Sequence, residues 1–448
     1  MNTSRRNMLL STLFGAGYVG LRALATGLPA SLLLNPRRAL ADPGCPATAK
    51  PQFVILNTSS NGDPLNANAP GTYDAPGIHH CPVPGMEPAS VLLGSHSYQA
   101  AAAWAAMKNL PSESASIWHL MTNTPVHPKE PDVLNLMGAI SPAEMFPSFL
   151  ARHLGPCLGT IQSQPITLGA TSPSEGLTYD GAALPIIPPL ALRATLVNPL
   201  GPLTTLQSLR DSTLNQLGDL YRNGASPAQR AFIDSLVTSQ SQVRNISQKL
   251  LDSLGAITDN SADSQILAAV ALIQMKVAPV LAIHIPFGGD NHHDVGLAAE
   301  GAATIAGLQT LDNLLAGLKS AGLADAVSLI SLNVFGRTLG PTSTDGRQHN
   351  PNHQVSFAIG KPFRGGVYGG VAQLSAAQGG DYGALPMDSK SGMGVAGGDI
   401  KPVDTLTAFG MTVATAVGVD PAIVAQQINS KYNPSGLGTA KVVSAALA

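Results

Sequence analysis

Short, strongly apolar segments that alternate with helical segments constrain this chain more than any other feature. Residues 53–56, 277–285 and 326–334 have the length and composition of buried strands, and a helical pattern over 302–318 connects the last two. A strand–helix–strand order implies parallel strands joined by a right-handed crossover. The sequence therefore predicts an α/β fold with a mostly parallel sheet sandwiched by helices.

Further helical patterns surround this predicted core. Residues 97–109 carry apolar side chains at helical spacing, and we expect Trp104 to pack in the core. Two long amphipathic helices are expected within about 203–256, the second beginning with Ser226 as cap and Pro227 as first residue. We expect these two to form a helical hairpin inserted in, or laid over, the α/β core. Two last helices, each begun by an acidic cap, are expected over 404–417 and 420–428.

The first residues of the chain predict export. Arg5-Arg6 is followed at once by an apolar run, which is the signature of a twin-arginine signal. The run is broken by several glycines and by Arg22, and it ends in Ala39-Leu40-Ala41, a small-x-small cleavage site. We expect residues 1–41 to be a signal peptide that the twin-arginine translocase reads and that is cleaved after Ala41, which makes the mature protein periplasmic or extracellular. The alternative is an uncleaved N-terminal membrane anchor.

The mature chain is acidic and large enough for one domain. Removing residues 1–41 takes away five of the 25 basic residues and none of the 27 acidic ones, which leaves a net charge of −7. We expect no nucleic-acid partner, because such proteins carry a basic stripe. We expect residues 42–448 to form a single α/β domain. No run of about 18 apolar residues free of charges follows the signal, so no membrane span is expected after cleavage.

The chain has three cysteines, Cys45, Cys81 and Cys157, all in its first third. An exported protein meets oxidising conditions, so we expect one disulfide. Cys81 and Cys157 are the preferred pair, although the pairing among the three stays open. No Cys-x-x-Cys motif and no Cys/His spacing typical of a zinc or haem site is present.

Polar clusters follow each of the three predicted strands. In an open α/β sheet, functional groups gather in the loops at the carboxyl ends of the strands, so we expect these clusters to meet. Carboxylate oxygens and imidazole nitrogens from separate loops form the usual ligand set of zinc or a similar divalent ion. The side chains concerned are Asp63 after the first strand, Asp290 and His292 after the second, and Asp345, His349 and His353 after the third.

Taken in order, these motifs resemble a large family of twin-arginine-exported proteins related to the alkaline phosphatase and sulfatase superfamily. The resemblance runs from about residue 52 to 428, and it implies an α/β/α sandwich with metals at the carboxyl edge of the sheet. The motifs that carry it are Gly62-Asp63-Pro64-Leu65-Asn66, Gly289-Asp290-Asn291-His292, Phe335-Gly336-Arg337-Thr338, Gly346-Arg347-Gln348-His349-Asn350-Pro351, Gly365-Gly366-Val367-Tyr368-Gly369 and Val417-Gly418-Val419-Asp420.

The resemblance also implies a ligand set. Asp63 matches the carboxylate after the first strand, Asp290 and His292 match an Asp-x-His pair, and His349 matches the histidine of an Asp-His pair. Three positions depart from the family pattern: Gln348 stands where aspartate is usual, 401–404 lacks the expected histidines, and Val334 replaces a frequent acidic residue. A neutral amide is a poor substitute for a carboxylate beside a dication. We therefore expect one zinc-like divalent ion or none, with both outcomes equally open.

Two functions remain open from the sequence. The first is an exported hydrolase of phosphate or sulfate esters, in which Arg337 or Arg347 clamps the small anionic ester through its bidentate fork. The second is a non-catalytic relative that keeps the fold to bind an envelope partner. No nucleophile is evident, and catalytic residues stay unassigned. Thr124 is a candidate for the position of the superfamily's alkoxide, but a threonine before proline is ordinarily a turn residue. The hydrolase hypothesis requires that the four candidate ligands converge within a few ångströms.

Overall fold

A computed structural model describes residues 53–137, 145–159, 164–169, 177–179, 182–184, 186–197, 207–244, 248–340, 346–428 and 438–448. The expected signal peptide, Cys45 and Asp345 lie outside these residues. In the described part of the chain, no helix combines the length and the hydropathy that crossing a membrane requires.

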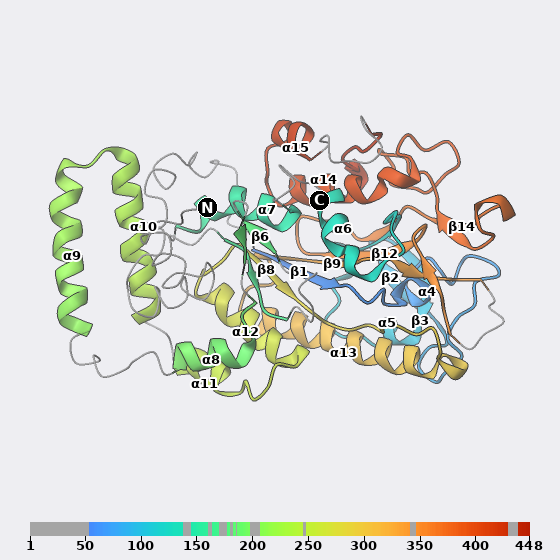
Figure 1. Ribbon diagram of the computed structural model, residues 1–448, viewed down its shortest axis with the longest axis horizontal. Helices are drawn as coiled ribbons and strands as arrows, with labels where there is room; N and C mark the ends of the chain where they lie inside the picture. The colour runs from blue at the N-terminus through green and yellow to red at the C-terminus, as the bar shows by residue number, and fades with distance from the viewer. Residues whose placement is uncertain are drawn as a thin grey trace, which may run out of the picture.

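A sheet of seven strands forms the centre of the described structure, in the order β13-β4-β12-β9-β1-β8-β5 (Figure 1). Its strands are β1 (Phe53–Ser59), β4 (Ala115–Leu120), β5 (Ile166–Thr167), β8 (Val280–Ile283), β9 (Val327–Asn333), β12 (Gln354–Ile359) and β13 (Gly366–Tyr368). β1 pairs in parallel with β8 and β9, and β12 pairs antiparallel with both β9 and β4. Because two antiparallel steps restore the direction, every strand of this sheet except β12 runs the same way. The expected mostly parallel α/β sheet is confirmed.

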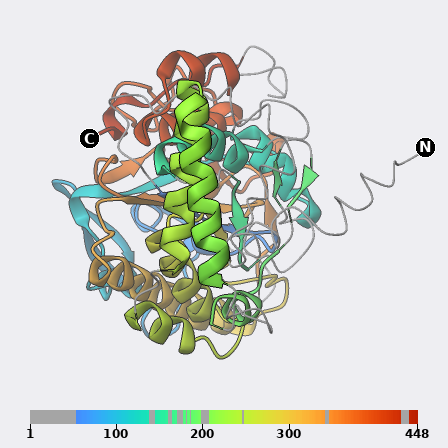
Figure 2. The ribbon, with the colours of Figure 1, turned by 90° about the vertical axis from the view of Figure 1, so that its left-hand side faces the viewer.

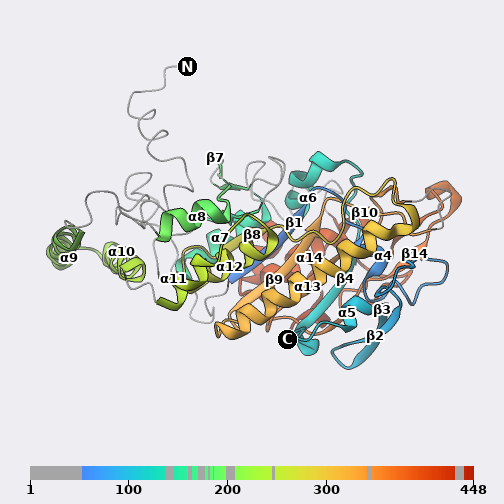
Figure 3. The ribbon, with the colours of Figure 1, turned by 90° about the horizontal axis from the view of Figure 1, so that it is seen from below.

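Alternate side chains of β1 show that both faces of the sheet are covered. Phe53 and Ile55 belong to one hydrophobic core, and Val54 and Leu56 belong to a second core on the opposite face. This double coverage is typical of parallel sheets and makes an α/β/α sandwich. The first core includes residues of α12 (Ala262–Gln274) and α13 (Ala298–Ser320), and the second includes residues of α6 (Glu130–Leu136), α7 (Phe146–Leu154) and α14 (Thr405–Ala416) (Figures 1 and 3).

The expected pair of amphipathic helices is present as α9 (Gln207–Gly224) and α10 (Pro227–Arg244). The two helices stand beside each other at one end of the molecule, away from the sheet (Figures 1 and 2). Ser226 caps α10 as expected, since its hydroxyl accepts from the backbone N–H of Gln229 at 3.4 Å. Gln229 Oε1 in turn accepts from the Ser226 N–H at 2.8 Å, which completes a capping box. After this pair, α11 (Gln248–Gly255) packs against α8 (Pro189–Val197) and α12.

The prediction of a helix over 97–109 is wrong for most of its length. Residues His96–Ala101 form β3, which pairs antiparallel with β2 (Pro88–Leu93), and only Ala102–Ala105 are helical as α5. Over so short a stretch, the apolar spacing fits a helix as well as a strand. Pairing with the preceding strand favours the β-hairpin. Trp104 does lie in the core, with 1% of its surface exposed.

The last two expected helices are present as α14 and α15 (Pro421–Gln427), each with the expected aspartate at its N-cap position, but only Asp420 makes a capping hydrogen bond. The Asp420 carboxylate accepts from the backbone N–H of Ala422 at 2.7 Å. The Asp404 side chain makes no capping hydrogen bond to α14 and accepts instead from the N–H and hydroxyl of Thr439, both at 2.7 Å.

The predicted pairing of Cys81 with Cys157 in a disulfide is wrong. Cys81 is a buried free thiol that donates to the carbonyl of Leu297 at 3.1 Å, and it packs against the start of α13. Cys157 does take part in a disulfide, in the short helix η3 (Gly155–Leu158) that follows α7. The spacing of cysteines along the chain does not show which of them lie close together in the fold, so it could not identify the pair.

A buried pair of histidines joins β4 to the residue just before β12. His119 Nδ1 lies 2.9 Å from His353 Nε2, and both side chains are fully buried. His119 Nε2 donates to the carbonyl of Pro70 at 3.1 Å, and His353 Nδ1 accepts from the Asn66 amide at 3.3 Å. Both rings therefore satisfy their hydrogen bonds in the neutral form. Burial lowers the pKa of His119 to about 4 and lowers the pKa of His353 well below its usual range.

These histidines should make the fold sensitive to acid. The unfolded chain protonates His119 near pH 6.5, whereas the folded protein resists protonation down to about pH 4. The stabilisation is thus complete above pH 6.5 and is lost as the pH falls, by about 3 kcal/mol for His119 between these limits. Urea unfolding at several pH values measures this loss, and it should be smaller in His119→Asn, which keeps an acceptor toward His353. An equal loss in both proteins would contradict the assignment.

Candidate metal centre

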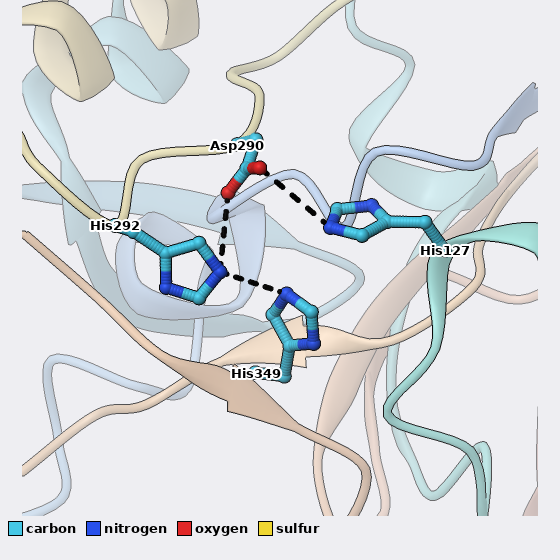
Figure 4. A group of neighbouring side chains, drawn as sticks. All are labelled: His127, Asp290, His292 and His349. Atoms are coloured by element: carbon cyan, nitrogen blue, oxygen red, sulfur yellow. Dashed lines mark hydrogen bonds and ion pairs between the residues drawn. The ribbon is translucent and has the colours of Figure 1, made fainter.

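Four side chains from three separate parts of the chain meet at the carboxyl edge of the sheet. His127 begins the short helix η2 (His127–Lys129) after β4, and Asp290 and His292 lie in the loop after β8. His349 lies in β11 (His349–Asn350), just before the reversed strand β12. Because β12 runs opposite to the other strands of the sheet, it begins at the edge where they end, and all four side chains reach that edge. One ligand atom from each of the four lies within 4.8 Å of the others (Figure 4).

The contacts within this group centre on one carboxylate and one imidazole nitrogen. Asp290 Oδ1 lies 3.3 Å from His292 Nε2, and Asp290 Oδ2 lies 3.7 Å from His127 Nε2. His292 Nε2 also lies 3.0 Å from His349 Nε2. Three imidazole nitrogens and one carboxylate oxygen are a donor set that zinc and similar divalent ions take in proteins.

The other ring nitrogen of each histidine has an oxygen acceptor. His127 Nδ1 donates to the Ser60 carbonyl at 3.0 Å, and His349 Nδ1 donates to the Pro125 carbonyl. His292 Nδ1 faces the amide oxygen of Gln348 at 2.9 Å. In a neutral ring, a protonated Nδ1 leaves a lone pair on Nε2, so three lone pairs and a carboxylate face one another. That arrangement is repulsive until a cation lies between them, and the residues therefore fit a bound divalent ion.

Phe335 forms an apolar wall of the centre. Its ring stacks on His349, with the ring centroids 4.2 Å apart, and meets the ring of His127 edge-on at 5.1 Å. Gly62 makes this packing available: its φ is +66°, and a Cβ there would come within 2.0 Å of the Phe335 ring. An apolar wall beside the ligands lowers the local dielectric and strengthens the electrostatic interactions of the centre.

Arg337 holds the carboxylate of the centre. Its buried guanidinium donates to Asp290 Oδ1 at 3.2 Å and to the carbonyls of Asn61 and Gly62 at 2.7 and 2.6 Å. Burial alone raises the pKa of Asp290, but the charge of Arg337 and its hydrogen bond hold that pKa below its usual range. Arg337 Nη1 is buried with no hydrogen-bond partner among the described residues. Its role in anion binding stays a prediction.

Arg347 lies in a buried ion pair beside the centre. Its Nε donates to Glu300 Oε2 at 2.7 Å, and both side chains are almost wholly buried. Two more of its donors reach the carbonyls of Thr338 at 2.8 Å and His79 at 2.7 Å. The guanidinium is thus engaged with protein groups, and its expected part in clamping an anion stays a prediction.

Asp63 lies at the same edge of the sheet but outside the group of four. Its backbone N–H donates to Asn333 Oδ1 at 3.3 Å, and its carboxylate is buried beside the side chains of Asn333 and Ser59. Burial raises the pKa of Asp63 to about 6, against the attraction of nearby His284. The structure therefore brings together Asp290, His292 and His349, leaves Asp63 apart, and adds His127.

The sequence carries a signal for His127 that spacing did not reveal. Residues 115–120 are a buried strand, and the loop that follows ends in His127 at the same edge as the other strand exits. Of the other residues singled out, His353 is paired with His119, and Thr124 is half-buried in the loop before His127. Thr124 has no chemical role that the described contacts define.

No protein-family model and no curated protein sequence matches this chain. Among solved structures, the chain is similar to the crystal structure of the PsFucS1 sulfatase from Pseudoalteromonas sp., at 14% sequence identity and a TM-score of 0.31. The similarity covers 88% of this chain and 75% of the sulfatase chain. A likeness this remote says nothing of activity, so the chemistry of the centre follows from its own residues alone.

The centre should bind one zinc ion per chain. His292 contributes the nitrogen closest to both Asp290 and His349, so His292→Ala should abolish stoichiometric binding. His293→Ala is the matched control, because His293 is the exposed neighbour outside the group. Elemental analysis after zinc loading and dialysis measures the occupancy. Zinc-free wild-type protein, or equal zinc in wild type and His292→Ala, would contradict this assignment.

Proposed function

We propose that this protein binds one zinc-type divalent ion at the group of three histidines and Asp290, and that it hydrolyses phosphate or sulfate esters there. The observation that carries the proposal is the convergence of three Nε2 atoms and a carboxylate, each histidine having an acceptor for its Nδ1–H. Asp63, which the family resemblance implies as a ligand, has no part in this single-ion centre.

The charges around the centre favour an anionic substrate. Neutral histidine ligands add no charge, and the negative charge of Asp290 is balanced by Arg337 at 3.2 Å. The positive charge of the ion is therefore left uncompensated, and it attracts an anionic ester. When bound, such an ion supplies Lewis acidity toward the oxygen atoms of the ester.

The chain's own residues would position and enclose the reacting group. Arg337 keeps Asp290 turned toward the histidines and adds a positive charge behind it. Phe335 excludes water from one side of the centre, which strengthens the attraction for a negatively charged ester. Arg347 would act indirectly, because its ion pair with Glu300 supports the loop that carries Asp290 and His292.

A non-catalytic role is the alternative, and the ligand count favours it. Four protein ligands close a tetrahedral zinc site, as structural zinc sites do, whereas catalytic sites keep one position open. The exposure of the ligands favours catalysis: Asp290 is 52% exposed, and His127 and His292 are each 34% exposed. Solvent access at this level leaves room for a substrate oxygen as a fifth ligand.

Zinc-loaded protein should hydrolyse a simple aryl phosphate or aryl sulfate. A chelator and Asp290→Ala should each remove that activity, by about 100-fold or more, because both remove the ion's Lewis acidity. His293→Ala should leave it unchanged. Release of the aryl alcohol is followed by absorbance. Stoichiometric zinc without hydrolysis of either ester class would favour the non-catalytic alternative.

We also propose that the protein is exported by the twin-arginine translocase and cleaved after Ala41. The support is the Arg5-Arg6 pair, the interrupted apolar run and the Ala39-Leu40-Ala41 motif. N-terminal sequencing of the exported protein should begin at Asp42, and replacement of both arginines by lysine should block export. Full-length protein retained in the membrane would favour the N-terminal anchor instead.

A further inference from the structure

We propose that Gln348 is a positioning residue of the metal centre. Its amide oxygen accepts the Nδ1–H of His292 and so presents Nε2 of that ring to the ion. Gln348 itself contacts neither ion nor substrate in this role. The inference rests on the metal site proposed above and identifies the side chain that sets the tautomer of one ligand.

Gln348 differs from the groups that accept the Nδ1–H of the other two histidines, because it accepts through its side chain. His127 and His349 donate Nδ1–H to the main-chain carbonyls of Ser60 and Pro125, which can only accept. Their tautomers are therefore fixed by the backbone. The Nδ1 of His292 faces a side chain instead, at 2.9 Å, so its tautomer depends on which residue stands at position 348.

The local structure holds residue 348 in place for this contact. Its backbone N–H donates to the Thr338 hydroxyl at 3.0 Å, and its carbonyl accepts from the Thr338 N–H at 2.9 Å. The neighbouring pair Arg337 and His349 is in register between β10 (Gly336–Arg337) and β11. The Gln348 side chain is exposed, whereas its neighbour Arg347 is buried. Replacement of Gln348 should therefore change the centre with little effect on stability.

An amide at this position also preserves the charge of the centre. A carboxylate would accept from His292 equally well, but it would add a negative charge next to the ligands. With Gln348, all three outer acceptors are neutral oxygens. The position thus orients a ligand while it leaves the positive charge of a bound ion available to an anion.

Two variants separate these roles. Gln348→Met keeps the length of the side chain and removes the acceptor, so zinc affinity should fall about 10–100-fold. Gln348→Glu keeps an acceptor and should retain zinc affinity. Gln373→Met, an exposed glutamine on β14 (Val371–Gln373), is the matched control and should match wild type. Zinc affinity is measured by competition with a chromophoric chelator, and the visible spectrum of the cobalt-substituted protein should change only in Gln348→Met.

Zinc affinity in Gln348→Met equal to that of wild type would overturn the inference. If wild-type protein binds no zinc, the metal site itself fails, and the tautomer is read from the ¹⁵N shifts of His292 in metal-free protein. Protonated Nδ1 in wild type, lost in Gln348→Met, would support the positioning role. Protonated Nε2 with bare Nδ1 in wild type would overturn it.

Inorganic phosphate tests the role of the amide in preserving charge. Zinc-loaded Gln348→Glu should bind phosphate about fivefold more weakly than zinc-loaded wild type, because of the added negative charge. Isothermal titration calorimetry measures both affinities. Equal or tighter phosphate binding by Gln348→Glu would overturn this part of the inference.

Discussion

One buried carboxylate, Glu300 near the start of α13, connects the loops on which the centre depends. Its Oε1 accepts from Asn68 at 2.9 Å after β1, its Oε2 accepts from Asn291 at 3.0 Å after β8, and both oxygens accept from Arg347. A charge buried this deeply is tolerated only when its partners are complete, since losing one partner of such a pair typically costs about 3–5 kcal/mol. The same requirement that pairs Glu300 also fixes Asn291 between Asp290 and His292, and fixes Arg347 two residues before His349.

Much of this arrangement could be predicted from the sequence, and the reasons are local. Buried strands can be recognised in the sequence because they are apolar on both faces. Parallel strands end at one edge of the sheet, which is why the sequence correctly predicted that Asp290, His292 and His349 lie close together. His127 was missed because β4 carries the polar residues Ser116 and His119 among its apolar ones, so the strand before it was not recognised. The hairpin at 88–101 and the free thiol of Cys81 depend on contacts between distant segments, which spacing along the chain does not encode.

The departures from the family pattern have a different meaning in three dimensions. Gln348, which from sequence alone is a lost ligand, lies behind a ligand and accepts from its ring at 2.9 Å. His127 supplies a nitrogen from a loop where none was expected. The four side chains thus supply enough ligands for one ion, although the ligand set of a two-metal site is incomplete. A change of residue type at one motif position therefore says little about a site until the neighbouring loops are placed.

The reversed direction of β12 shapes how the centre is encoded along the chain. After β9, the short strands β10 and β11 pair with each other at the carboxyl edge, and β12 then enters the sheet from that edge. The described residues between Arg337 and His349 include no helix, whereas the 23-residue helix α13 separates the loop after β8 from β9. One short part of the chain therefore contributes Arg337, which holds Asp290, the ligand His349, and Gln348, which accepts from His292. Substitutions within this one stretch therefore reach three parts of the centre without altering the helices that cover the sheet.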